Sequence, residues 1–266
     1  MDASLLFDPL FRLPFVAGLL LTITLPLLGV MLRLRDEWLA SLGLAHLAAA
    51  TGLAGLALHI PVVVGGVVGA VFGALGKSLA RGQGNSVYAF MIFVGWSLTL
   101  LIAANTVLGS AMGHALVDGQ LYFAGTAQLF AVAGLFLASA LGLPWLMPRL
   151  IRARFFPRNE TANRLPAWRW HLGFDLLVAL GMAVGVGTVG LMGAFALVFL
   201  PPWMAFRVAQ SWRSTLFFSA GLATLGYLVA FVLALTMDQP FGPMLVAVLL
   251  IQAMLVAVSQ RMKARQ

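Results

Sequence analysis

The sequence predicts an all-α membrane protein, a bundle of eight or nine transmembrane helices. Of its 266 residues, 62% are hydrophobic and 9% are charged, whereas charged residues make up about a quarter of an average soluble domain. The mean hydropathy is +1.00, and the apolar residues gather in runs close to the ~20 residues that a helix needs to cross the hydrocarbon core. We therefore expect one transmembrane domain over residues 1–266.

Nine apolar runs follow one another, each bounded by polar or turn-forming residues. They cover residues 14–32, 39–58, 61–76, 86–109, 121–147, 172–187, 189–206, 214–236 and 243–260. The sixth and seventh runs are short and adjacent, so one broken element is the alternative to two crossings. Residues 1–13 form an amphipathic lead-in, and residues 149–171 form the one long polar loop.

The basic residues predict the orientation, because cytoplasmic loops carry an excess of lysine and arginine. With nine crossings and an outside N-terminus, the basic residues after the odd-numbered runs all fall on the cytoplasmic side, and Arg12 in the lead-in is the exception. We therefore expect loop 149–171 and the C-terminus to be cytoplasmic. The residues that set this orientation are Arg33, Arg35, Lys77, Arg81, the arginines of loop 149–171, Arg207, Arg213, Arg261, Lys263 and Arg265.

Composition and motifs also exclude several classes of function. The chain has no cysteine, so it has neither a disulfide framework nor a thiolate metal site. The net charge is +8, but the basic residues are scattered over loops and form no continuous groove for nucleic acid. Gly76-Lys77-Ser78 resembles the end of a phosphate-binding loop, yet Val71 stands where that motif needs glycine. We find no catalytic constellation and expect no enzyme and no cofactor bound by this chain.

Polar side chains within the apolar runs are the candidate substrate-path residues, because such groups usually face a cavity or a partner. His46 lies in the middle of the second run, and imidazole can bind zinc or manganese, relay protons, or pack as a hydrogen-bonded core residue. Asn105 and Thr126 are further polar groups at depth, and each could bond a neighbouring helix. His114 and Asp118 could meet a cation at an outer entrance or be ordinary solvated loop residues.

The stretch from Val189 to Arg213 has the most distinctive pattern in the chain. Its apolar run meets Pro201 and Pro202, which should end or sharply bend the helix, since proline lacks an amide hydrogen and crowds the preceding turn. The residues that follow place apolar side chains among basic and polar ones, as in a short helix lying at a membrane surface. The apolar residues are Trp203, Met204 and Val208, and the basic and polar residues are Arg207, Gln210, Ser211 and Arg213. An ordinary interfacial loop is the alternative.

Three stretches of the chain carry loose motifs in a common order. They are Leu44-Ala45-His46 in the second run, the segment from Val189-Gly190 to Leu200-Pro201 with its basic continuation, and the hexapeptide from Asp238 to Pro243 before the last run. Together they resemble the membrane subunit of bacterial ABC importers for zinc, manganese and iron. The resemblance extends over nearly the whole chain and agrees with its size and predicted topology.

This resemblance implies a permease of the bacterial plasma (inner) membrane that dimerises, with a homodimer expected, around a central path. An extracytoplasmic solute-binding protein would deliver the metal ion, and a separate cytoplasmic ABC ATPase would use ATP to drive transport. His46, with Asn105 and Thr126, would line the path, His46 being the candidate metal ligand. The coupling helix that docks on the ATPase would be residues 201–213, with Pro201, Pro202, Trp203, Arg207 and Arg213.

Four positions depart from the family pattern. Leu42 stands one turn before His46 where the family usually has Asp, Thr126 stands where Asp or Ser is common, and Trp203 and Phe206 replace small or basic residues. One imidazole without a carboxylate suits a bare hard dication poorly. Three explanations remain open. The metal ion could pass without a high-affinity site in the path, the substrate could be a metal chelate or another small solute, or the other subunit of a heterodimer could supply the acid.

Two functions from other classes remain as alternatives. One is a proton-coupled secondary carrier with His46 as the proton relay, although such carriers often contain inverted repeats and we find no convincing repeat here. The other is a membrane scaffold with no transport function, against which the polar groups at depth argue mildly.

Overall fold

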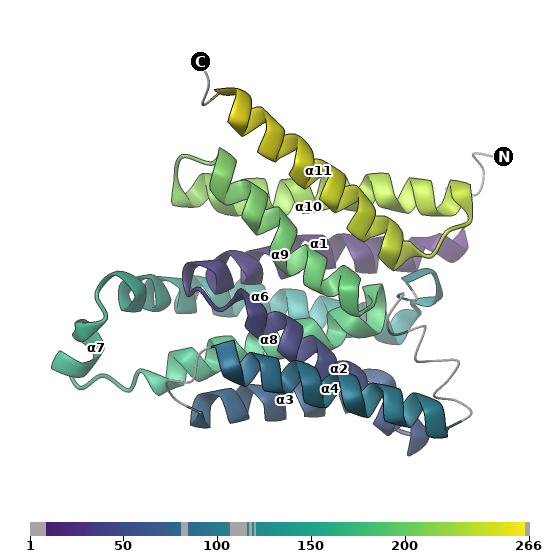
Figure 1. Cartoon of the computed structure of the whole chain (residues 1–266), viewed down its shortest axis with the longest axis horizontal. Coiled ribbons are helices and arrows are strands. Elements are labelled where there is room, and N and C mark those ends of the chain that lie inside the picture. Colours follow the sequence, from purple (N-terminus) through teal and green to yellow (C-terminus); the bar gives the residue numbers. More distant parts are fainter. Residues whose placement is uncertain (1–8, 81–84, 107–115, 117–118, 120, 264–266) are drawn as a thin grey trace. The chain divides into compact units, whose positions relative to one another are not determined.

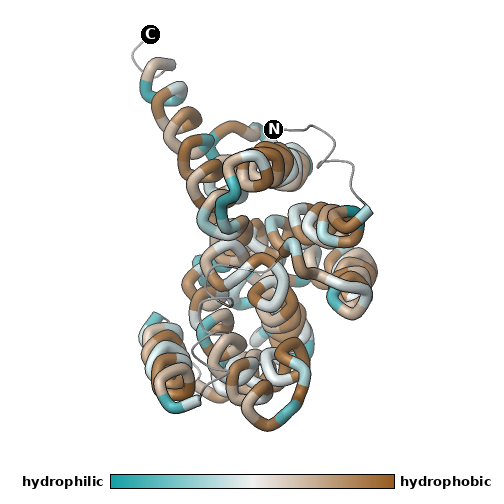
Figure 2. Tube along the Cα trace, turned by 90° about the vertical axis from the view of Figure 1, so that its right-hand side faces the viewer, coloured by the Kyte–Doolittle hydropathy of each residue, from teal (hydrophilic) through white to brown (hydrophobic). Residues whose placement is uncertain are grey.

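The computed structural model describes residues 9–80, 85–106, 116, 119 and 121–263, and over these residues every regular element is a helix (Figure 1). Hydrophobic positions are spread over the helices, as expected of elements that face either lipid or one another (Figure 2). The elements are η2 Pro9–Phe11, α1 Arg12–Leu34, α2 Trp38–Ala57, α3 Val62–Leu79, α4 Asn85–Asn105, η3 Leu121–Phe123, α6 Thr126–Phe155, α7 Arg158–Ala162, α8 Trp168–Val189, α9 Leu191–Val208, α10 Trp212–Met237 and α11 Phe241–Lys263.

Nine of the described helices are long and apolar enough to cross a membrane, which confirms a multi-pass, all-helical membrane protein. The sixth and seventh apolar runs form two helices, α8 and α9, with Gly190 alone between them at φ +83°. A Cβ atom placed on Gly185 would lie 2.9 Å from the Cβ of Ala194, whereas nine residues of continuous helix would separate the two by about 13 Å. The chain therefore reverses at Gly190, and the left-handed backbone conformation there requires glycine.

The chain folds into two compact units, each assembled from distant segments. One comprises residues 1–30, 114–133 and 185–266, and the other comprises residues 31–113 and 134–184. The predicted lead-in, 1–13, belongs to the first unit. Of this lead-in, residues 1–8 lie outside the described part, Pro9–Phe11 form η2, and α1 has already begun at Arg12.

In the second unit, α2 packs against both α3 and α4, and glycines allow the backbones to approach closely. A Cβ on Gly65 of α3 would lie 2.5 Å from the carbonyl oxygen of Thr51 in α2, and one on Gly95 of α4 would lie 2.5 Å from the carbonyl carbon of His46. This contact sets the position of α4 along the axis of α2 at the level of His46.

In the first unit, α9, α10 and α11 pack together around an aromatic core. The buried Tyr227 donates a hydrogen bond from its hydroxyl to the carbonyl oxygen of Phe15 at 2.9 Å. The rings of Phe231 and Phe241 lie 5.7 Å from that of Tyr227. The core therefore ties α1, α10 and α11 together through both packing and a satisfied hydroxyl.

The helix end predicted at Pro201 and Pro202 is wrong, because both prolines are buried inside α9, which continues to Val208. Pro202 removes the amide that would bond the carbonyl of Val198. Gly29 of α1 packs on that carbonyl so closely that a Cβ there would overlap it. Tertiary packing thus holds the helix together where local preference disfavours it. The chain leaves the helix at Ala209, and Ser211 caps α10 in a capping box with Ser214.

Candidate functional site

His46 is buried in the middle of α2, with 4% of its surface exposed. Its ring meets that of Trp96 on α4 edge to face, with centroids 5.7 Å apart and planes at 76°. One turn earlier, Leu42 is half-buried and supplies no ligand. Within the described ranges, no group of three or more His, Cys, Asp or Glu side chains could hold a metal ion. His46 therefore packs against the Trp96 ring and belongs to no such group.

The other described path residues of the prediction lie at helix ends. Asn105 is exposed at the end of α4, where its amide donates to the carbonyl oxygen of Leu101 at 2.8 Å. It lies nine residues beyond Trp96, or about 13 Å along the helix. Thr126 begins α6, is exposed, and belongs to the other unit. The predicted entrance residues His114 and Asp118 lie outside the described residues.

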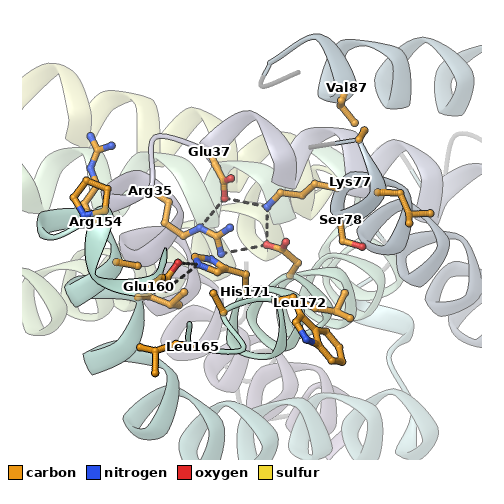
Figure 3. Close-up of a pocket in the computed structure, with 18 of the residues that line it drawn as sticks. Arg35, Glu37, Lys77, Ser78, Val87, Arg154, Glu160, Leu165, His171 and Leu172 are labelled. Atoms are coloured by element: carbon orange, nitrogen blue, oxygen red, sulfur yellow. Dashed lines mark hydrogen bonds and ion pairs between the residues drawn. The ribbon is translucent and has the colours of Figure 1, made fainter. Parts of the chain in front are cut away.

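Sequence reasoning missed a closed cluster of four charged side chains, which we call the ion quartet: Arg35, Glu37, Lys77 and Asp175 (Figure 3). The Lys77 ammonium lies 2.6 Å from Asp175 and 2.9 Å from Glu37. Arg35 Nε lies 2.7 Å from Glu37, and Arg35 Nη1 lies 3.3 Å from Asp175 as an ion pair without hydrogen-bond geometry. Each cation therefore faces both anions.

The ion quartet is electrically neutral and largely removed from water. Its side chains are between 6% and 25% exposed, and the rings of Phe174 and Tyr88 lie 5.1 Å from Arg35 and 5.8 Å from Lys77. Burial raises the pKa of Glu37, but Arg35 and Lys77 together outweigh burial and hold that pKa below its ordinary value. The carboxylate is therefore ionised at neutral pH.

The quartet joins the C-terminal ends of α1 and α3 to the N-terminal parts of α2 and α8. These four helix ends thus lie on the same side of the second unit. This agrees with helices that cross the membrane in alternating directions, because the ends of odd-numbered crossings and the starts of even-numbered ones then share a side. One signal could have revealed the cluster: Asp175 is an acid inside the sixth apolar run, and an intramembrane acid implies a partner.

A cavity of about 890 Å³ lies beside the quartet and extends to the end of α6 and the start of α8. Besides the quartet, its described lining includes Arg154, Glu160 and His171. Glu160 accepts a hydrogen bond from Trp170 Nε1 at 2.9 Å and lies 3.2 Å from His171 Nε2. Because the acids among its described lining residues are already paired with neighbouring bases, they are not free to bind a small cation.

The predicted coupling residues divide into a buried and an exposed set. Pro201 and Pro202 are buried and Trp203 is half-buried, whereas Arg207 and Arg213 are exposed. The Arg207 guanidinium stacks on Trp203, 3.8 Å from the ring centre. The surface open to a partner is therefore the last turn of α9 and the link to α10.

Comparison with known proteins identifies the family. The model of the ABC 3 transport family matches residues 8–260, nearly the whole chain. The chain belongs to the ABC 3 transport family. It is accordingly a permease subunit of an ABC transporter and not an enzyme, since the ATPase of this family is a separate subunit.

Two solved structures share the fold at low sequence identity. PsaBC from Streptococcus pneumoniae, solved in complex with Fab, aligns with a TM-score of 0.82 and 15% identity over 95% of this chain and 92% of that one. An inward-facing transporter described as of the metal-chelate ABC type aligns with a TM-score of 0.70 and 14% identity over 92% of this chain and 85% of that one. A sequence search of curated proteins gave no match.

Proposed function

We propose that this chain is the permease of an ATP-driven importer for a divalent metal ion, with zinc and manganese as the leading candidates. The observation that carries the proposal is the family match over residues 8–260. Two copies would enclose the path, an extracytoplasmic binding protein would deliver the ion, and a cytoplasmic ATPase would drive the cycle. The membrane would be the bacterial plasma membrane, with the C-terminus in the cytoplasm.

In this proposal His46 is a transient ligand of the passing ion. A buried neutral imidazole offers one nitrogen lone pair to zinc or manganese, and the neighbouring Trp96 ring fixes the imidazole without competing for the metal. A single ligand holds an ion weakly, which favours release, because an ion that is bound too tightly cannot leave the path.

A metal chelate is the second candidate cargo, and one observation favours it. No cluster of three or more acidic or histidine ligands exists among the residues that the structure describes, and Leu42 offers no oxygen beside His46. A chelate brings its own ligands, so its path needs shape and weak polar contacts more than carboxylates. The proton-coupled carrier is not favoured, because the family is one of ABC transporters.

The exposed corner formed by Arg207, the link at residues 209–211 and Arg213 is the proposed contact for the ATPase. Because α9 is continuous through its two prolines, this corner is the end of an 18-residue helix that packs against α10 and α11. A push on it would move α9 as a rigid element. The prolines would then contribute indirectly, through their packing inside the helix.

Uptake measurements test the proposal directly. The permease is expressed with its ATPase and binding protein in cells that lack other uptake systems. The cells are supplied with zinc, manganese, iron or their chelates, and the metal content of the cells is measured by mass spectrometry. We expect His46→Asn to lower uptake at least tenfold. The matched control is His59→Asn, on the exposed loop between α2 and α3, where asparagine tolerates the positive φ of 60°. Equal uptake by both variants would contradict the role of His46, and the absence of metal uptake by the wild type would contradict the function.

A further inference from the structure

Trp96 is a tryptophan in the middle of a membrane-spanning helix. Helix α4 runs from Asn85 to Asn105, so Trp96 lies about 16 Å from the start of the helix and about 14 Å from its end. Tryptophans that face lipid gather at the two membrane interfaces, where the indole N–H meets headgroups and water. A tryptophan at mid-span therefore needs another explanation.

The ring of Trp96 packs over His46 where α2 and α4 lie side by side (Figure 1). The two rings meet edge to face with their centroids 5.7 Å apart. His46 is 4% exposed, whereas Trp96 is 47% exposed. Among the described residues, neither the imidazole nor the indole has a hydrogen-bond partner. In its neutral form the imidazole therefore keeps an unused nitrogen lone pair, and the Trp96 ring covers it.

The Trp96 side chain can move away from His46, but the backbone of α4 cannot move cheaply. A Cβ atom on Gly95 would lie 2.5 Å from the carbonyl carbon of His46, so the two backbones are in close contact at this level. The outer side of the Trp96 ring is open, because about half of the residue is exposed. Rotation about the side-chain bonds of Trp96 thus uncovers the imidazole while the two helices stay together.

The polar groups of this ring pair indicate that water, and not lipid, lies beyond Trp96. A polar group that is buried without a hydrogen bond costs free energy, and ionisable groups within a membrane span usually face a cavity or a partner. The indole N–H of Trp96 likewise needs an acceptor, which hydrocarbon does not offer. Both requirements are met if this side of α2 and α4 adjoins a transport path.

We propose that Trp96 is a lid between His46 and the transport path. In the structure the indole closes off the imidazole, and it turns aside to admit the ion. The inference rests on the proposed function, in which His46 is a ligand of the ion, and it adds the residue that decides when this ligand is available. Because the open lid is a minor state, the apparent affinity of His46 for the ion is lowered in proportion to the open fraction.

Thiol labelling tests the lid without any cargo. The chain has no cysteine, so His46→Cys places a single thiol behind Trp96. The full-length permease is reconstituted in nanodiscs and treated with a positively charged methanethiosulfonate, which modifies thiols that water reaches and does not enter lipid. Mass spectrometry of the intact protein gives the rate of modification.

Four proteins are compared: H46C, H46C/W96A, H46C/W96L and H46C/F93A. The last is the matched control, because Phe93 lies about one turn before Trp96 on α4 and is 68% exposed. A separate His59→Cys variant, on the exposed link between α2 and α3, shows that the reagent is active.

We expect H46C/W96A to react at least tenfold faster than H46C, with H46C/W96L intermediate and H46C/F93A unchanged. H46C alone should react slowly but measurably, because the lid opens from time to time. A tenfold ratio corresponds to a lid that is open about one tenth of the time.

Two results would overturn the proposal. Equal rates with and without Trp96 would show that its ring does not separate position 46 from water, and H46C/W96L decides this point if H46C/W96A fails to fold. No reaction of H46C with Trp96 in place would show a fixed cover that never opens. Either result leaves the proposed function standing, since that function is tested separately by metal uptake of the wild type.

Discussion

Removing one charge from the ion quartet should destabilise the protein strongly, and Asp175→Asn is the sharpest test. Asp175 is 6% exposed and contacts both cations. At an effective dielectric constant of about 20, unit charges 2.6 Å apart attract each other by about 6 kcal/mol. Desolvation offsets part of this, so the expected loss is ~3–5 kcal/mol, as is usual when a buried cation loses its partner. The melting temperature in detergent should fall on the order of 10 °C.

A double variant separates the charge effect from general damage. Lys77→Met with Asp175→Leu removes one cation and one anion together and leaves Arg35 paired with Glu37 at 2.7 Å. The double variant should therefore melt above either single variant, because no uncompensated charge remains buried. The control is His171→Ala, which breaks a more exposed pair with Glu160 and should cost less than ~1 kcal/mol. Additive losses in the double variant would refute the quartet as a neutral, coupled unit.

The quartet also predicts how stability depends on pH. Burial raises the pKa of Glu37, but Arg35 and Lys77 lower it further, so its folded-state pKa lies below the ordinary value of 4.5. A lowered pKa means that the stabilising contribution is complete above pH 4.5 and is lost as the pH falls through the folded-state pKa. Melting temperatures should be level from pH 8 to about pH 5 and then decline, and Glu37→Gln should reduce this decline.

Three further predictions concern the path, the helix packing and the coupling corner. Leu42→Asp adds a carboxylate one turn before His46 and should let purified protein retain zinc or manganese, detected by elemental analysis; metal content equal to wild type would refute this. Gly29→Ala should destabilise by ~1–3 kcal/mol through overlap with Val198, whereas Gly221→Ala, with open space around it, should not. Arg207→Glu should weaken co-purification of the ATPase, and unchanged subunit stoichiometry would argue against docking at that corner.

Eight or nine spans could be predicted from sequence because the thickness of the hydrocarbon core sets the length of each apolar run, and the described helices contain nine. Helix ends were less accurate, since a helix continues beyond its apolar part. The fifth run was expected to end at 147, yet α6 continues to Phe155 through arginines that form helix well. Hydropathy reports where lipid ends, not where backbone hydrogen bonding ends.

Two features of the candidate site depended on tertiary contacts that no local pattern encodes. Pro201 and Pro202 disfavour helix locally, but the close approach of Gly29 and burial of the helix keep α9 continuous. The ring contact between His46 and Trp96 depends on the position of α4 along the axis of α2, and the close contact at Gly95 sets that position. Sequence could identify His46 as unusual but could not supply its neighbour.

The distribution of acids constrains what kind of complex could carry a bare metal ion. Five acids are described. Three of them are ion-paired, namely Glu37, Glu160 and Asp175, and the other two, Asp36 and Asp238, lie on exposed loops. A second copy of the same chain would add another His46 but no unpaired carboxylate from the described helices, since Asp36 and Asp238 lie on loops. Two imidazoles suit zinc, whereas manganese favours oxygen ligands. If the described residues supply the ligands of the path, a homodimer transporting a bare ion is therefore expected to select zinc, and manganese selectivity would require ligands from elsewhere, such as a different second subunit or a chelating carrier. Native mass spectrometry of the purified complex, combined with its uptake profile, distinguishes these cases: a homodimer that imports manganese as the bare ion would contradict the argument.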